Sequence, residues 1–212
     1  EACTDHRKQV TRVNSVEEVA IGRVLRSSTT GFACGTRSHE MELPSFGAFV
    51  MTHHSNGSNV DVIGLIYGIH IDDDPLVRQL ILANNINAST IRDQRENRMV
   101  PVEMSIVNVG YRINGDSFHN LPPKPPISLD TVYMCDDHCV RSFTQKFDFF
   151  RLVLNTSEVP NEELMAAAIK HAASARPIRE QRDFLVTAGR RLAQMLSHDL
   201  PRLNHLLRLI KP

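Results

Sequence analysis

The stretch that decides the fold runs from Ile21 to Ile71 and reads IGRVLRSSTTGFACGTRSHEMELPSFGAFVMTHHSNGSNVDVIGLIYGIHI. It contains short runs rich in β-branched and aromatic residues, and turn-forming residues separate these runs. The runs predict strands over residues 21–25, 32–34, 48–51 and 62–69. The Asn56-Gly57 pair favours a hairpin loop because both residue types tolerate a positive φ. Short strands joined by tight turns predict an antiparallel β-barrel or sandwich.

The rest of the chain predicts two further strands and then helices. Strands are expected at 100–109 and 130–134, and three aspartates before Pro75 predict the start of a helix near 75–84. After residue 159, apolar residues recur at helical spacing in three successive segments. We therefore expect an α+β fold. A small antiparallel β-barrel domain over residues 1–140, with an inserted helix near 75–84, precedes a C-terminal helical appendage over residues 141–212.

Phenylalanines mark the beginning of the appendage. Phe143, Phe147 and Phe150 have the spacing of one helical face, and Phe149 is the fourth ring in this segment. We interpret these rings as a plug that holds the appendage against the barrel. The alternative is a platform on which single-stranded bases stack.

Three segments of the predicted barrel resemble a known family. They are Ile21-Gly22-Arg23-Val24 with Ser27-Ser28-Thr29, then Phe46-Gly47-Ala48-Phe49-Val50, and then Val62-Ile63-Gly64-Leu65-Ile66-Tyr67-Gly68. In this order they resemble the HAS-barrel family, the small barrel shared by HerA-type helicases and rotary ATP synthase subunits. The resemblance implies a barrel that builds a subunit ring or serves as a docking platform for another protein. An unrelated small β-barrel with similar turns is the alternative.

No motif for nucleotide hydrolysis accompanies the barrel. The chain contains no Gly-x-x-x-x-Gly-Lys-Ser/Thr loop, no Gly-x-Gly-x-x-Gly and no Gly-x-Ser-x-Gly. The resemblance therefore implies the barrel without the ATPase domain. An enzyme would have to use His70 with Asp72, or the turn from Cys135 to Cys139. No evident nucleophile accompanies the His/Asp pair, so we predict a non-enzymatic protein with no catalytic residues and no cofactor.

Cys135, His138 and Cys139 have residue types that bind zinc. A structural zinc site needs four ligands, and the fourth would come from Cys3, Cys34, His53, His54 or His119. The spacing of these residues does not require such a site. We therefore predict free thiols in the turn and no bound metal.

The charge balance is neutral overall and uneven along the chain. Lysine and arginine number 24, and aspartate and glutamate also number 24. From Asn161 onward there are nine basic against five acidic residues, a net charge of +4, so the preceding part carries −4. A neutral total gives no general argument for nucleic-acid binding. No apolar run approaches the ~20 residues of a membrane span, and four cysteines are too few for a disulfide scaffold. These features predict a cytoplasmic protein.

The expected function is that of a non-enzymatic adaptor, or a subunit of a larger protein assembly, that docks through the barrel edge and its amphipathic C-terminal helices. The alternative is a nucleic-acid-associated accessory module. In either case the candidate contacts are Arg179, Arg182, Arg190 and Arg191, on the polar face of the predicted helix at 177–197.

Overall fold

The computed structural model describes residues 18–38, 44–53, 59–71, 82, 100–157 and 159–211. The helix predicted near 75–84 lies outside the described residues, apart from Leu82. Three residues considered as metal or catalytic candidates, Cys3, His54 and Asp72, also lie outside them.

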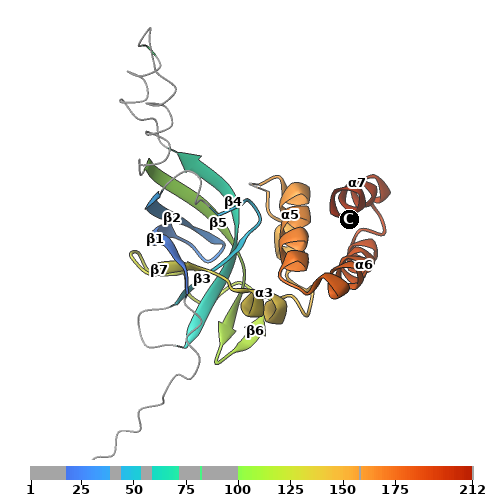
Figure 1. The fold of residues 1–212 in the computed structure, drawn as a ribbon, viewed down its shortest axis with the longest axis horizontal. Coiled ribbons are helices and arrows are strands. Elements are labelled where there is room, and N and C mark those ends of the chain that lie inside the picture. The colour runs from blue at the N-terminus through green and yellow to red at the C-terminus, as the bar shows by residue number, and fades with distance from the viewer. Residues whose placement is uncertain are drawn as a thin grey trace, which may run out of the picture.

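Six of the described strands close into an antiparallel β-barrel, as predicted (Figure 1). Their order around the barrel is β2-β1-β7-β3-β4-β5, and β5 pairs back with β2. Closure brings Gly31 opposite Val107 at one end of the β2–β5 pair and Ser38 opposite Val100 at the other. The strands are β1 (Ala20–Ser27), β2 (Gly31–Ser38), β3 (Phe49–His53), β4 (Val60–Ile71), β5 (Val100–Ile113) and β7 (Thr131–Met134).

A short hairpin extends β5 beyond the barrel. Asn114 has φ +52° and Gly115 has φ +95°, which is the pair of positive φ angles that a tight hairpin turn requires. The returning strand is β6 (Asp116–Phe118). The strand predicted at 100–109 continues to Ile113, and the turn at Asn114 and Gly115 follows it directly.

Glycines in β4 lie where the pairing with β5 changes register. The shifts occur between Ile63 and Gly64 and between Ile66 and Gly68, and glycines in strands often mark such bends. A Cβ atom on Gly64 would lie 2.3 Å from Cγ2 of Ile106 on the neighbouring strand. The absence of a side chain at Gly64 therefore lets the two strands approach closely.

The barrel wall separates two apolar clusters. The first includes Val24, Phe32, Ala48, Val50, Ile66, Met104, Ile106 and Val132. The second combines the alternate residues Phe49, Met51, Ile63 and Leu65 of β3 and β4 with the buried faces of the helices. Because successive side chains of a strand point to opposite faces, β3 contributes to both clusters, and its four residues Phe49–Thr52 are buried. The second cluster joins the appendage to the barrel.

Five helices follow the barrel in the described part of the chain. They are α3 (Asp137–Phe143), α4 (Phe150–Leu154), α5 (Asn161–Ser174), α6 (Ile178–Met195) and α7 (Leu200–Ile210). Helix α5 lies between the barrel and the α6–α7 pair, and it contacts both of these helices (Figure 1). The three helices predicted after residue 159 correspond to α5, α6 and α7. The helical appendage is therefore present as predicted.

The phenylalanine segment differs from its prediction in one respect. Phe143 ends α3 and Phe150 begins α4, so the rings do not share one continuous helical face. They still gather, because Phe49 of the barrel meets Phe143 and Phe149 edge to face, with ring centroids 6.1 and 6.0 Å apart. Phe143, Phe149 and Phe150 are each at most 1% exposed. Phe143, Phe149 and Phe150 form the expected plug and are not available to stack on bases, whereas Phe147 is half-buried beside Phe150 and Phe184.

A tight turn before β3 also contacts the appendage. Gly47 has φ +81°, and its amide donates a hydrogen bond to the Ile66 carbonyl at 2.8 Å. A Cβ atom built on Gly47 would lie 2.5 Å from Cβ of Ala167 in α5 and 2.9 Å from the Ala167 carbonyl carbon. Helix α5 therefore rests directly on this turn.

Candidate functional site

The four predicted arginines do not form one site. At 100° per residue, Arg179, Arg182 and Arg190 fall on one side of α6, whereas Arg191 is turned about 100° away from Arg190. Arg179, Arg182 and Arg190 are exposed. Arg191 donates a hydrogen bond to Oδ1 of Asp148 at 3.0 Å, and this contact ties α6 to the segment before α4. The structure therefore brings three of the four arginines to one surface and gives Arg191 a structural contact.

Two other basic residues of the tail hold the appendage together. The Arg176 guanidinium lies 3.7 Å from the centroid of the Phe184 ring and donates to Oγ1 of Thr144 at 2.8 Å. Arg202 pairs with Glu162 and donates to the Leu154 carbonyl at 3.2 Å. The positive charge of the C-terminal region is therefore partly used within the protein.

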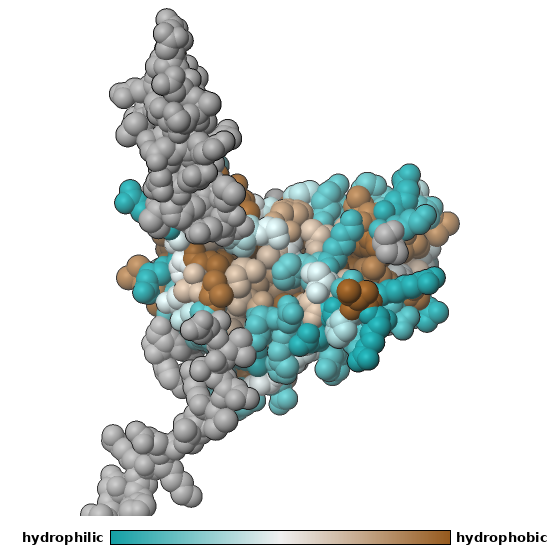
Figure 2. Space-filling model, viewed as in Figure 1, coloured by the Kyte–Doolittle hydropathy of each residue, from teal (hydrophilic) through white to brown (hydrophobic). Residues whose placement is uncertain are grey.

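Helix α6 is longer than the helix that covers it. Leu207 and Ile210, near the end of α7, lie 3.3 and 3.9 Å from the position of a Cβ atom on Gly189. The described part of α7 ends shortly after this contact, while α6 continues for about two and a half further turns toward Ile178. On this overhang Ile178 is 88% exposed and Val186 is 45% exposed. Figure 2 shows the same end of the molecule, where hydrophobic side chains lie between hydrophilic ones.

The turn at Cys135 buries both thiols. Asp136 caps α3 by accepting a hydrogen bond from the Cys139 amide at 2.7 Å, and Arg112 donates to the Cys139 sulfur at 3.3 Å. The hydrogen bond between the two thiols lowers the pKa of Cys139 and raises that of Cys135. His138 is exposed, whereas both cysteines are buried. Among the residues that the structure describes, no group of three or more potential metal ligands occurs.

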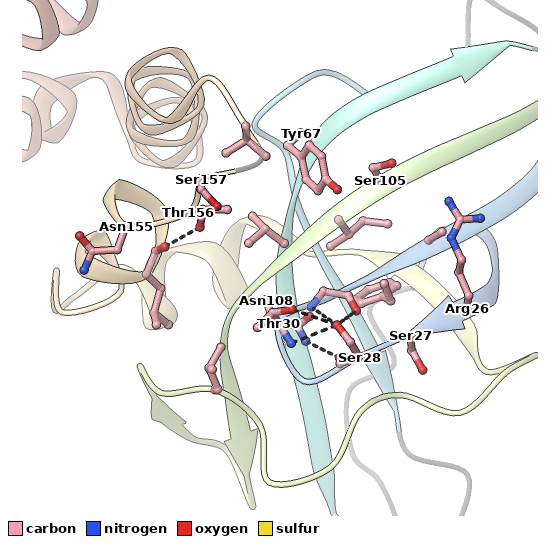
Figure 3. Close-up of a pocket in the computed structure, with 18 of the residues that line it drawn as sticks. Arg26, Ser27, Ser28, Thr30, Tyr67, Ser105, Asn108, Asn155, Thr156 and Ser157 are labelled. Carbon is pink, nitrogen blue, oxygen red and sulfur yellow. Dashed lines mark hydrogen bonds between the residues drawn. The ribbon is translucent and has the colours of Figure 1, made fainter.

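A cavity that the sequence did not indicate lies between the barrel and α4 (Figure 3). Its volume is about 540 Å³. One wall is the β1–β2 turn with β4 and β5, and the other is α4 with the segment that follows it. Asn108 on β5 is one of the lining residues and is only 1% exposed, so its side chain is buried behind the cavity wall.

Asn108 has one buried polar atom without a partner. Its side-chain amide donates to the carbonyls of Thr29 at 3.0 Å and Ser28 at 3.4 Å, while Oδ1 accepts no hydrogen bond from the described residues. An unsatisfied buried acceptor costs about 1–3 kcal/mol. The only signal in the sequence was an asparagine within an otherwise apolar strand segment, Ile106–Val109.

Two sequence comparisons with known proteins identify no relative of this chain. No protein-family model matches the chain, and no curated protein sequence matches it significantly. Membership of the HAS-barrel family therefore stays a prediction from the three sequence segments. Within the described part of the chain, none of the helices combines the length and the apolar character needed to cross a membrane.

Proposed function

We propose that this protein is a non-enzymatic adaptor, or a subunit of a larger protein assembly, and that it docks a partner on the overhanging half of α6. The observation that carries the proposal is the exposed side of α6 beyond the end of α7, where Ile178 and Val186 lie among the arginines. An amphipathic helix normally buries its apolar residues against another element. On this half of α6, a partner would supply that element.

The dimensions define the size of the surface. The 18 residues of α6 extend about 27 Å, whereas the 11 residues of α7 extend about 16 Å. The difference of about 11 Å corresponds to about two turns of a partner helix. Full burial of one isoleucine side chain contributes about 1.5–3 kcal/mol, so Ile178 alone can anchor a weak contact.

The charges around the overhang indicate the character of the partner. Arg179 and Arg182 flank Ile178 and Val186, and Glu180 bonds to Arg179 at 3.3 Å. A partner helix with an apolar stripe and acidic flanks would match this surface, since complementary charge steers association and fixes register. The resemblance to HAS-barrel proteins also supports a role in assembly.

Closure of the barrel affects the mode of docking. The β2 and β5 strands that would form the outer edges of an open sheet pair with each other instead. Strand addition at those edges, one of the two routes expected from the sequence, is therefore blocked over their paired length. Docking through helix side chains remains and is the route we favour.

The test compares two matched variants in a native pull-down from the source organism, followed by mass determination of the intact assembly. Ile178 and Leu200 are the first residues of α6 and α7 and are 88% and 60% exposed. Glutamate is compatible with the first turn of a helix at both positions. We expect Ile178→Glu to lose the partner and Leu200→Glu to retain it. If both variants retained the partner, or the wild type had none, the docking proposal would be wrong.

A second candidate function rests on Arg179, Arg182 and Arg190, which share one exposed side of α6. If these residues contact three phosphates, the logarithm of the affinity for a nucleic acid should fall with the logarithm of salt concentration with a slope of about −2 to −3. Replacing all three by glutamine should remove this slope. Asp183 lies among them and opposes such binding. An affinity for nucleic acid that did not change with salt, or that survived the triple substitution, would exclude this candidate.

A further inference from the structure

His53 bridges two carboxylates at one end of the seam where β7 joins β1 to β3. Its Nδ1 atom lies 2.6 Å from Oδ1 of Asp61 on β4, and its Nε2 atom lies 3.3 Å from Oε2 of Glu18, which is two residues before β1. The docking surface proposed on α6 involves none of these residues. We propose that His53 is a pH-sensitive tether: its protonated ring holds Glu18 on the barrel, and loss of one proton releases Glu18.

The two contacts can both be hydrogen bonds only when the His53 ring carries a positive charge. An ionised carboxylate accepts hydrogen bonds and donates none, so each ring nitrogen has to donate. A neutral imidazole has one N–H group, whereas an imidazolium has two. The arrangement of Glu18, His53 and Asp61 therefore fits the protonated ring, and loss of one proton breaks one of the two hydrogen bonds.

The contact with Glu18 is the one that breaks. The contact with Asp61 is shorter, and Asp61 lies directly opposite His53 in the β3–β4 pair, so the ladder fixes its position. The side chain of Glu18 is 44% exposed and that of Asp61 is 26% exposed, so water screens the Glu18 contact more strongly. The neutral ring therefore keeps its proton on Nδ1 and turns the lone pair of Nε2 toward the Glu18 carboxylate, which repels it.

The surroundings of His53 set the direction of the response. Among the described residues, the titratable groups beside the ring are Asp61, Glu18 and Tyr133 of β7, whose ring centroid lies 5.3 Å from that of His53. The hydrogen bond to Asp61 raises the pKa of His53, partial burial opposes this, and the charges of Asp61 and Glu18 raise it further. The tether therefore holds below the pKa of the folded protein and releases as pH rises through it.

Release of Glu18 loosens one end of the β1–β7 seam (Figure 1). The residue after Glu18 is Val19, whose carbonyl accepts a hydrogen bond from the Met134 amide at 2.9 Å. Further along the same seam, the Leu129 amide donates to the Val24 carbonyl at 2.8 Å. The Met134 amide therefore reports on the tethered end of the seam, and the Leu129 amide reports on the other end.

The test is amide hydrogen exchange of the full chain by NMR, at pH values below and above the pKa of His53. That pKa is measured from the His53 ring resonances, and each exchange rate is divided by the intrinsic rate at the same pH. In the wild type, the protection of the Met134 amide should fall about 1.5- to 5-fold through the titration, which is the range that exposed ion pairs support. The protection of the Leu129 amide should not change.

Two matched variants identify the carboxylate that is responsible. The glutamine of Glu18→Gln can accept from the protonated ring or donate to the neutral one. This variant should lower the pKa of His53 and make the protection of Met134 independent of the titration. Glu180→Gln removes an exposed carboxylate on α6 and should leave both quantities as in the wild type.

The proposal is overturned by any of four results. The first is a Met134 protection that does not change through the His53 titration, and the second is an equal change in Glu18→Gln. The third is a pKa of His53 that Glu18→Gln leaves unaltered. The fourth is a loss of protection at Leu129 as large as that at Met134, because the whole seam would then respond to pH.

Discussion

Replacing Gly47 by alanine should destabilise the protein more than any strain in the turn alone can explain. Gly47 has φ +81°, and a side chain in the left-handed region costs about 1–2 kcal/mol. The added Cβ would also lie 2.5 Å from Cβ of Ala167 and 2.9 Å from the backbone of α5. Overpacking of this kind costs about 1–3 kcal/mol, because a helix backbone cannot move as a flexible side chain does. The expected loss for Gly47→Ala is therefore about 2–5 kcal/mol.

Gly115→Ala is the matched control for this prediction. Gly115 has φ +95°, and no atom lies within 4 Å of the position of its added Cβ. Its expected loss is the conformational cost alone, about 1–2 kcal/mol. Urea denaturation followed by far-UV circular dichroism gives the free energy of unfolding for both variants. Equal losses in the two variants would show that α5 does not rest on the Gly47 turn, and the described junction between barrel and appendage would be wrong.

Three other predictions concern the core, the histidines and a strained leucine. Phe149→Ala should lower the free energy of unfolding by about 3–5 kcal/mol, as measured by urea denaturation, because the ring is 1% exposed within the phenylalanine cluster. Burial lowers the pKa of His171 in the folded protein. The unfolded protein therefore binds a proton at this residue more readily, and stability is lost as pH falls below about 6.5. The hydrogen bond to Asp61 raises the pKa of His53, so its contribution is present below about 6.5 and is lost as pH rises through the folded value. The urea concentration at the unfolding midpoint is measured at about pH 7.5 and about pH 5.5. On this acidification, the midpoint of His171→Phe should change in the stabilising direction relative to the wild type, and the midpoint of His53→Asn should change in the destabilising direction relative to the wild type. The opposite changes would contradict the two pKa directions. Leu129 has φ +74° and is 70% exposed, so Leu129→Asn should raise the thermal midpoint by relieving strain of about 1 kcal/mol, and a lower midpoint would refute this.

The barrel and the appendage could be predicted because their signals are local. The short β-branched runs each act within a few residues, and the helical periodicity of α5 to α7 is equally local, whereas the predicted Asn56-Gly57 loop lies outside the described residues. The sequence could not show the break between α3 and α4. Phe143 and Phe150 fit one helical period, but the core that buries them draws Phe49 from the barrel, almost a hundred residues earlier.

The site residues depend on contacts that the sequence does not encode locally. Arg191 looked like its neighbours until the structure placed Asp148 3.0 Å away. In the sequence, Asn108 is one polar residue in a buried strand. Only the structure shows that its side-chain amide donates to the Ser28 and Thr29 carbonyls. The exposure of Ile178 and Val186 on the overhang of α6 likewise depends on where α7 ends. Each of these depends on distant pairings, which is why composition and spacing could not predict them.

The position of β7 has a consequence for how the chain folds as it is synthesised. This strand is the last of the barrel in sequence, yet it lies between β1 and β3, where Val132 pairs with both Gly22 and Thr52. Until Thr131–Met134 has left the ribosome, β1 and β3 each keep an unpaired edge, and more than a hundred residues separate Gly22 from its partner. Such distant pairing slows folding, and open edges during that interval favour association between nascent chains. A fragment that ends before residue 131 would retain those unpaired edges permanently and should aggregate. Synthesis of the four residues Thr131–Met134 supplies the strand that pairs with both edges and closes the barrel.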